Sequence, residues 1–300
     1  MSARLRALAQ QTQEIVAAGR YHASDGRALS IAAAVEAARA GTRMYGPEPV
    51  GAPAAGPASA PGESTLFEVT GESSLDAARR LVRKDAGRPA DPVAVLNFAS
   101  ARNPGGGFLN GAQAQEEALC RASALYTCLL RAREFYDHHR AHRDPFYTDR
   151  VIHSPAVPVF RDDRGGLLDE PYTAGFLTAA APNAGVVLRT APERAPELGP
   201  ALAVRAERVL ETAAAHGYRR LVLGAWGCGV FQNDPAQVAG AFHDLLVNGR
   251  FAGAFDHVVF GVLDRTRDQA TRGSFEQAFA HHVRALNASR TAPASGARPN

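Results

Sequence analysis

Residues 92–117 read PVAVLNFASARNPGGGFLNGAQAQEE and combine three local signals. Residues 92–100 are nearly all apolar, which is typical of a strand buried on both faces of a sheet. Three successive glycines follow at 105–107, in a stretch that predicts a tight turn. A helix is then predicted from about residue 114 to about residue 133. A strand, a Gly-rich turn and a helix in succession indicate an α/β domain.

The rest of the chain continues this alternation. Residues 164–185 are predicted to be irregular, with a strand at their middle. The other predicted elements are strands at 65–70, 151–155, 157–160, 219–229 and 257–264 and helices at 74–83, 198–216, 235–248 and 274–286. This order predicts a three-layer α/β/α domain around a mixed sheet. In such sheets ligands bind beyond the carboxyl ends of the strands.

The N-terminal quarter of the chain has a different composition. Helices are predicted at 2–18 and 28–40, and residues 46–63 are rich in Pro, Gly and Ala, which predicts a linker. We therefore expect an N-terminal helical extension with its linker at 1–63 and a catalytic body at 64–287. The Ala-, Ser-, Pro- and Arg-rich residues 288–300 are expected to form a disordered tail.

The bulk composition limits the classes of protein. Of 300 residues, 46 % are hydrophobic, which allows a sizeable core, and the formal net charge of +3 gives no strong nucleic-acid signature. The three cysteines match no zinc or disulfide framework. Because no secretory signal or membrane-spanning run is seen, the expected location is cytoplasmic.

The glycine triplet precedes two adjacent carboxylates, Glu116 and Glu117, in the first turn of the predicted helix. Glycines let the backbone approach a ligand closely, and a helix start offers free N–H groups to a pyrophosphate. Acidic residues at a helix start also have a purely structural explanation, since they interact favourably with the helix dipole. Neighbours on a helix point about 100° apart, so the two Glu are expected to have different roles.

Residues 219–242 again combine a strand, a Gly-rich loop and a helix, with glycines at 224, 227 and 229. Phe231 in this loop either folds back into the core or packs against a sugar ring. Cys228 is not expected to be a nucleophile, because no histidine lies near it in the sequence. Asp234 and Pro235 are typical of a helix start.

The spacing of these motifs resembles a known family. GGG, seven residues and then QEE resembles the signature of poly(ADP-ribose) glycohydrolases, and the surrounding NFASARNPGGG resembles their bacterial branch. The resemblance covers about residues 65–270. It implies a macrodomain-like fold and hydrolysis of ribose–ribose bonds to release ADP-ribose, which reverses ADP-ribosylation, including in the DNA damage response.

The resemblance also implies partners. These are poly(ADP-ribose), ADP-ribose and ADP-ribosylated proteins, with no membrane, no sequence-specific nucleic acid, no cofactor and no metal ion. The N-terminal helices resemble an accessory segment that is thought to cover the adenosine end of the ligand in bacterial members. Cleavage from chain ends is expected on that basis.

The same resemblance assigns roles to residues. Glu117 is expected to be the general acid and base, with Glu116 as its partner in holding ribose hydroxyls. A proton donor must be neutral, which burial and a nearby diphosphate favour and helix-start N–H groups oppose. The expected ligand-binding residues are Asn103, Gly105, Gly106, Gly107, Gln115, Gly227, Cys228, Gly229, Val230, Phe231 and Glu72, the last as an acceptor for the adenine amine.

Other readings stay open. A macrodomain that binds ADP-ribose without cutting it would share the glycine loops but would not need the carboxylate pair. A hydrolase of single ADP-ribose groups on protein or DNA would share the pocket, and an α/β domain for another nucleotide is the least specific reading. His138 and His142 have a metal-compatible spacing, although a solvated helix end explains them better.

Overall fold

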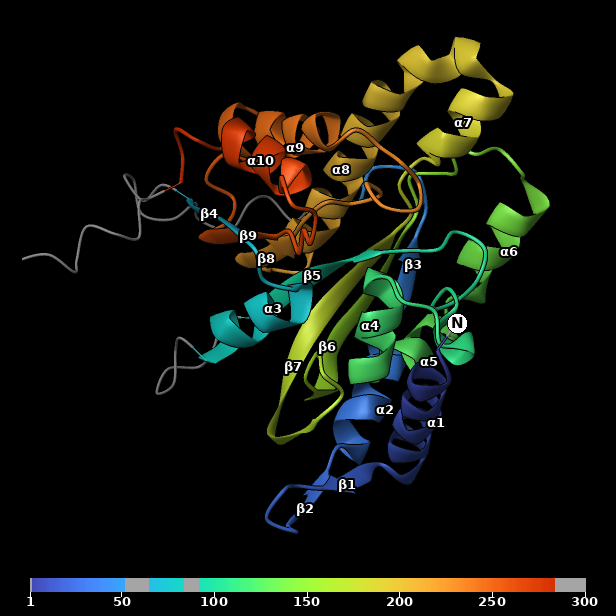
Figure 1. Cartoon of the computed structure of the whole chain (residues 1–300), viewed down its shortest axis with the longest axis vertical. Coiled ribbons are helices and arrows are strands. Elements are labelled where there is room, and N and C mark those ends of the chain that lie inside the picture. The colour runs from blue at the N-terminus through green and yellow to red at the C-terminus, as the bar shows by residue number, and fades with distance from the viewer. Residues whose placement is uncertain (1, 52–64, 84–91, 284–300) are drawn as a thin grey trace, which may run out of the picture.

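A seven-stranded mixed sheet forms the centre of the protein, in the order β3-β6-β7-β5-β8-β9-β4 (Figure 1). The computed structural model describes residues 2–51, 65–83 and 92–283. The strands of this sheet are β3 (Arg43–Tyr45), β4 (Leu66–Thr70), β5 (Val93–Phe98), β6 (Val151–Arg161), β7 (Leu167–Ala179), β8 (Arg220–Leu223) and β9 (His257–Gly261). The five strands from β7 to β4 run parallel, whereas β6 and β3 add antiparallel at one side.

Helices cover both faces of the sheet. One layer packs its apolar side chains into a first core cluster, and it contains α1 (Ala3–Ala18), α2 (Ala32–Gly41), α3 (Ser74–Arg83), α4 (Gln115–Ala122), α5 (Leu125–Leu129) and α6 (Arg133–Ala141). The other layer packs into a second cluster, and it contains α8 (Leu198–Ala215), α9 (Pro235–His243) and α10 (Ala270–Ala278). The predicted three-layer α/β/α arrangement with a mixed sheet is confirmed.

The predictions for the two long antiparallel strands were partly wrong. The pieces expected at 151–155 and 157–160 are one strand, β6, which continues through a register shift at Ala156, whose φ is +45°. The segment expected to be irregular contains the 13-residue strand β7. Its first half extends beyond the end of β5, pairs with β6 and is largely exposed, so it carries the polar residues that hide the strand pattern.

The single helix expected at 114–133 was also wrong. It breaks into α4 and α5 at Ser123, whose backbone is extended and forms an antiparallel bridge with Val159 of β6. The Ser123 hydroxyl donates to the Leu119 carbonyl, which satisfies an acceptor at the end of α4.

The first fifty residues pack directly on the sheet. After α1, a small hairpin of β1 (Arg20–His22) and β2 (Ala28–Ser30) leads into α2, and β3 then pairs with β6 as an edge strand. Residues 52–64 and 284–300 lie outside the described part of the chain, and with them most of the expected linker and tail. The division of the chain at residue 63 stays a prediction.

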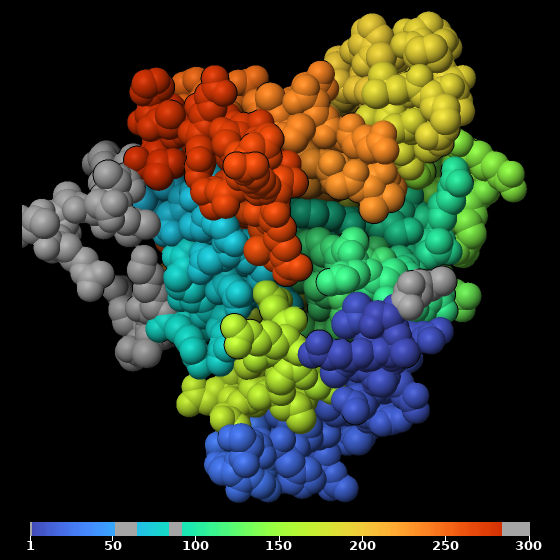
Figure 2. Space-filling model, in the orientation of Figure 1, coloured from blue at the N-terminus to red at the C-terminus, as the bar shows by residue number. Residues whose placement is uncertain are grey.

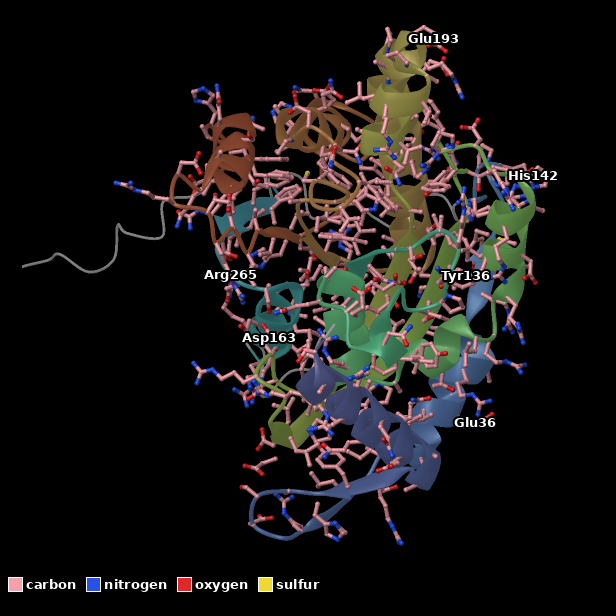
Figure 3. The ribbon with its side chains drawn as sticks, turned by 45° about the vertical axis from the view of Figure 1, so that its right-hand side comes forward. Glu36, Tyr136, His142, Asp163, Glu193 and Arg265 are labelled. Atoms are coloured by element: carbon pink, nitrogen blue, oxygen red, sulfur yellow. The ribbon has the colours of Figure 1, made fainter. Side chains whose placement is uncertain are left out.

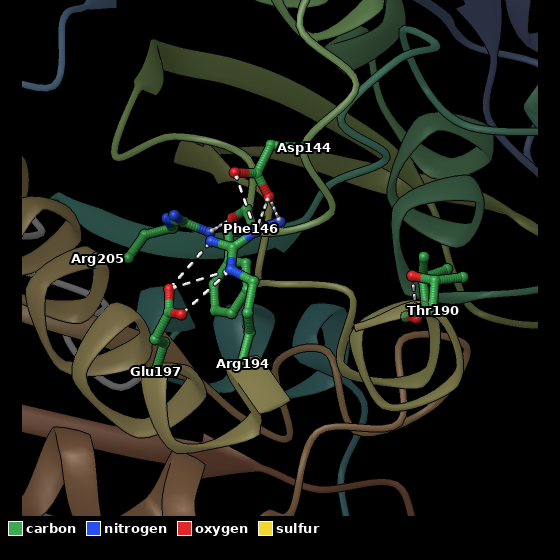
Figure 4. Close-up of polar contacts among 7 residues, drawn as sticks. Asp144, Phe146, Thr190, Arg194, Glu197 and Arg205 are labelled. Atoms are coloured by element: carbon green, nitrogen blue, oxygen red, sulfur yellow. Dashed lines mark hydrogen bonds and ion pairs between the residues drawn. The ribbon is translucent and has the colours of Figure 1, made fainter. Parts of the chain in front are cut away.

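A smaller lobe extends from the sheet beside α8. It consists of α7 (Ala184–Thr190) and a 3-10 turn (Pro192–Glu197), packed around a cluster of its own. The Arg194 guanidinium lies 4.3 Å from the centre of the Phe146 ring and pairs with Glu197 and Asp144 (Figure 4). These contacts fix the lobe to the segment that leads into β6.

Candidate active site

A large cleft opens at the carboxyl ends of the parallel strands. Its volume is about 1680 Å³, and its wall is built from loops that follow β5, β8 and β9, from the start of α3, and from α1 and the hairpin tip between β6 and β7. In Figure 2 these green, orange, red, blue and yellow-green segments face the viewer together. The position agrees with the general rule for open α/β sheets.

The glycine triplet forms the part of this wall that follows β5. Gly105 and Gly106 have φ values of +67° and +57°, a backbone region that glycine adopts readily. A Cβ atom on Gly106 would lie 2.5 Å from Oε1 of Glu117 and 3.2 Å from Oε2 of Glu116. The two carboxyl groups therefore converge on the backbone of one glycine, where a side chain would displace them.

Two backbone N–H groups of the connection between β5 and α4 hold the carboxyl group of Glu117. Its Oε1 accepts from the Gly107 N–H at 2.9 Å and its Oε2 accepts from the Ala114 N–H at 3.1 Å. Its side chain is 8 % exposed and lines the cleft. Backbone donors thus fix the orientation of this carboxyl group relative to the glycine triplet.

Glu116 lies deeper, beneath the same loop. Its Oε2 accepts from the Ser100 N–H at 2.7 Å, and its Oε1 lies 3.2 Å from Nδ2 of Asn97. Burial raises the pKa of Glu116 from its usual 4.5 to about 8, and the charge of Glu117 adds to the rise. At pH 7 this carboxyl group is therefore mostly neutral.

Gln115 connects the catalytic helix to the sheet. Its amide oxygen accepts from the Phe98 N–H at 2.9 Å, and its amide nitrogen donates to the Leu96 carbonyl at 2.8 Å and to the Ser74 hydroxyl at 3.1 Å. Its amide groups are thus engaged with β5 and α3. Its expected contact with the ligand remains a prediction.

The second glycine loop faces the first across the cleft. Gly227 has a φ of +73°, and a Cβ atom there would lie 2.5 Å from Nδ2 of Asn233 and 2.6 Å from Cβ of Ala181. Nδ2 of Asn233 donates to the Gly227 and Pro182 carbonyls, which fixes the loop from behind. Sequence reasoning did not single out Asn233, although its place just before the Asp-Pro helix start was visible.

Phe231 packs against the core and also faces the cleft, so its contact with a sugar ring remains a prediction. Its ring is half-buried against the second core cluster and 5.8 Å from the ring of Tyr147, and it also lines the cleft. Val230, beside it, is 81 % exposed at the cleft edge. Cys228 lines the cleft as well, but burial raises the pKa of its thiol to about 12, which opposes a thiolate nucleophile.

Of the remaining predicted residues, two line the cleft and two lie outside its lining. Asn103 and Gly229 line the cleft. Gly105 does not line it, and packs instead against Tyr126, which does. Glu72 also lies outside the lining, and its carboxylate pairs with Arg80 at 2.7 Å, so its expected contact with adenine remains a prediction.

The residues of the far wall of the cleft were not predicted, although the family resemblance implied that the N-terminal helices cover one end of the ligand. Arg4 of α1 donates to the Arg164 carbonyl at 2.9 Å, and Leu8 packs against Gly165 in the hairpin tip. Asp163 of this hairpin and Arg265, which follows β9, both line the cleft and are labelled in Figure 3. The two contacts of α1 join segments nearly 160 residues apart, so no local pattern could have shown them.

The histidines of α6 do not form a metal cluster. The His138 and His142 rings stack with centres 4.1 Å apart, and Nδ1 of His142 contacts the His138 carbonyl at 2.9 Å. Within the described ranges, no three His, Cys, Asp or Glu residues group as potential metal ligands. In the same ranges no helix has both the length and the apolar character needed to cross a bilayer.

Comparison with known families agrees with this geometry. The model of the microbial-type PARG catalytic domain matches residues 9–162, which include the glycine triplet and the carboxylate pair. The chain belongs to the microbial-type poly(ADP-ribose) glycohydrolase (PARG) family. The macrodomain-like fold expected from the sequence is thereby confirmed.

Solved PARG structures superpose on most of the chain. The enzyme from Thermomonospora curvata is 49 % identical, with a TM-score of 0.84 over 93 % of this chain and 100 % of that one. A structure of the same PARG bound to the inhibitor ADP-HPD is 50 % identical, with a TM-score of 0.82 over the same shares of the two chains. The PARG from Deinococcus radiodurans in complex with ADP-ribose is 44 % identical, with a TM-score of 0.72 over 82 % and 97 % of the two chains. No curated protein matches the chain.

Proposed function

We propose that this PARG hydrolyses the ribose–ribose glycosidic bonds of poly(ADP-ribose) and releases ADP-ribose. The observation that carries the proposal is the convergence of Glu116 and Glu117 on Gly106 inside the cleft. The second glycine loop lines the cleft and supplies backbone N–H groups for the diphosphate. In the first loop the Gly106 N–H donates to the Asn103 carbonyl and the Gly107 N–H donates to Glu117, so this loop shapes the site around the carboxyl pair. The relatives named above bind ADP-ribose or ADP-HPD, which supports the same ligand class here.

In the proposed reaction the bond breaks through an oxocarbenium-like transition state. Glu117 donates a proton to the leaving ribose oxygen and then, as a carboxylate, accepts a proton from the attacking water. Its two backbone hydrogen bonds hold the carboxyl group in place through both steps. A bound diphosphate and the exclusion of water favour the neutral form that the first step needs.

Glu116 acts in this scheme as a neutral partner that binds a ribose hydroxyl. Its protonation at pH 7 follows from burial. A second negative charge at this position would repel both Glu117 and the diphosphate of the ligand. We therefore expect turnover to fall as Glu116 loses its proton, near pH 8.

Cleavage from chain ends and a cytoplasmic location belong to the same proposal. The contacts of α1 with the hairpin tip close one side of the cleft, which supports binding of a terminal unit over an internal one. The location rests on the sequence features given above. Action in the DNA damage response is proposed from the family resemblance alone.

The deciding experiment compares three substrates with one protein. Free ADP-ribose is measured after incubation with poly(ADP-ribose), with singly ADP-ribosylated protein and with ADP-ribosylated DNA. Release from the polymer alone is the expected result. Binding of ADP-ribose without release would instead identify a reader module, and release from single modifications would identify the alternative hydrolase.

Glu117→Gln provides the matched test of mechanism. Loss of a general acid lowers kcat by about 10² to 10⁴ fold, whereas ADP-ribose affinity measured by calorimetry should stay near the wild-type value. Full activity of this variant would contradict the assignment of the proton donor.

A further inference from the structure

A pair of buried polar side chains lies in the middle of the sheet, under the start of α4. Asn97 of β5 and Thr178 of β7 are direct partners in the parallel register, and both are fully buried. Nδ2 of Asn97 lies 3.1 Å from Oγ1 of Thr178 and 3.2 Å from Oε1 of Glu116. One amide group therefore connects the centre of the sheet to a carboxyl group of the cleft.

The Asn97 side chain lowers the stability of the fold, so folding does not explain its presence. Asn97 interrupts a strand whose preceding residues, Val93 to Leu96, are buried and apolar, and its Oδ1 atom is buried without a hydrogen-bond partner among the described residues. An unpartnered buried acceptor lowers stability, and a leucine of similar volume would remove that cost. The contact with Glu116 gives the amide a reason to be there.

We propose that Asn97 is a positioning residue for glycosidic bond hydrolysis: its amide, anchored on Thr178, holds the Glu116 carboxyl group against the floor of the cleft. The inference rests on the proposed function. The Ser100 N–H holds Oε2 of Glu116 and Asn97 holds Oε1. The Gly105 N–H is a further backbone donor to this carboxyl group. Asn97 supplies its side-chain donor from the sheet, and without it the carboxyl group is held from the loop side alone and turns more easily about its last bond.

The groups around Glu116 define the charge that it senses. Glu117 and Cys120 face it from α4, and Tyr136, labelled in Figure 3, interacts with it from α6. Burial raises the pKa of Cys120 and of Tyr136 well above their usual values, so both are neutral at pH 7. The Asn97 amide favours the charged form of Glu116 and so lowers its pKa, in opposition to burial and to Glu117.

The test uses Asn97→Leu in the full chain, with release of ADP-ribose from poly(ADP-ribose) as the assay. Loss of one buried hydrogen bond to the carboxyl group should lower kcat about tenfold while KM stays within about twofold. The fall of kcat at alkaline pH should move to higher pH, because Glu116 loses a donor that favours its charged form. A merely structural role of Asn97 would leave the pH profile where it is.

Two further variants keep the result interpretable. Asn97→Leu combined with Thr178→Val removes donor and acceptor together, so it tests the same contact without leaving the Thr178 hydroxyl unpartnered. Ser154→Ala removes a buried side-chain contact of 3.2 Å to Thr42 elsewhere in the sheet, and its kcat and pH profile should match the wild type.

Wild-type kcat and an unshifted pH profile in either folded Asn97 variant would overturn the inference. A wild-type protein that releases no ADP-ribose would overturn the proposed function as well. An active wild type with unaffected variants would overturn this inference alone.

Discussion

Gly106 and Glu117 lie so close together that position 106 has no room for a side chain: a Cβ atom on Gly106 would lie 2.5 Å from Oε1 of Glu117. The same carboxyl oxygen accepts from the N–H of the next glycine, Gly107, at 2.9 Å. The glycine triplet therefore serves the carboxyl group as well as the ligand. Its spacing to the Glu pair follows from this contact, because the loop must return its backbone to the first turn of α4.

Gly106→Ala should remove most of the activity. The new methyl group meets Glu117, and the φ of +57° is strained for alanine. A displacement of about 1 Å at a reacting group costs about a hundredfold in kcat, and backbone strain costs about 1–3 kcal/mol of stability. Polymer digestion and thermal unfolding measure the two effects separately.

Gly240→Ala is the matched control for that substitution. Gly240 lies inside α9, and no atom outside its own helix lies within 4 Å of its added Cβ. Activity should be unchanged, and stability should rise by about 0.5–1 kcal/mol. Equal loss of activity in both variants would show that the Gly106 contact has no special role.

Glu116→Gln should change the pH dependence of activity more than its maximum. Burial raises the pKa of Glu116 to about 8, and glutamine imitates the neutral form at every pH. We expect the alkaline fall of kcat near pH 8 to disappear, with a kcat at pH 7 within about tenfold of the wild type. A loss as large as that of Glu117→Gln would mean that Glu116 itself transfers the proton.

The same substitution should alter stability in a defined direction. The folded state keeps a proton on Glu116 between pH 4.5 and about 8, whereas the unfolded state releases it. Stability therefore falls as pH rises through this window, by up to about 1.4 kcal/mol per pH unit. Urea unfolding at pH 5 and pH 8 should show a smaller difference in Glu116→Gln than in the wild type.

The strand–loop–helix units around the site were predictable because local signals agree there. β5 is apolar along most of its length, and the glycines and the Glu pair follow directly. A strand was predicted at the middle of residues 164–185, but the full length of β7 was missed because Asp169, Glu170 and Pro171 lie on its exposed first half, where no core imposes a pattern. The continuity of such a strand comes from its pairing with β6, which a local pattern does not contain.

The floor of the site gave a weaker local signal, and the contacts of the far wall gave no local signal. Asn97 is a polar residue inside an otherwise apolar strand, and that departure from the pattern was visible in the sequence. The contact of Arg4 with Arg164 joins positions 160 residues apart and depends on where α1 packs. Only the assembled fold brings those two segments to the cleft.

Acid should destabilise the edge of the sheet through His153. Its ring is buried, lies 2.8 Å from the Tyr218 hydroxyl through Nε2, and stacks on His216 with centres 3.7 Å apart. Burial lowers the pKa of His153 from 6.5 to about 3, so its stabilising contribution is present above pH 6.5 and is lost as pH falls toward 3.

His153→Gln should therefore flatten the loss of stability between pH 6.5 and pH 4, since glutamine does not titrate there. Urea unfolding at these two pH values measures the effect. His22→Gln, at an exposed position of β1, is the control and should follow the wild-type curve. A wild-type slope in His153→Gln would show that acid acts elsewhere in the fold.

Phe231→Ala should separate turnover from binding. The ring is supported by the second core cluster and by Tyr147, so it presents a rigid flat surface to the cleft. A sugar ring that loses this support is misplaced relative to Glu117, which should lower kcat by about a hundredfold. Loss of one contact surface should weaken ADP-ribose binding much less, because the backbone N–H groups of the second glycine loop remain. Phe231→Leu keeps the apolar volume without the flat ring, and its kcat should lie between those of Phe231→Ala and the wild type. Calorimetry with ADP-ribose and digestion of polymer give the two quantities, and an equal fall in affinity and kcat would leave Phe231 as a simple binding contact.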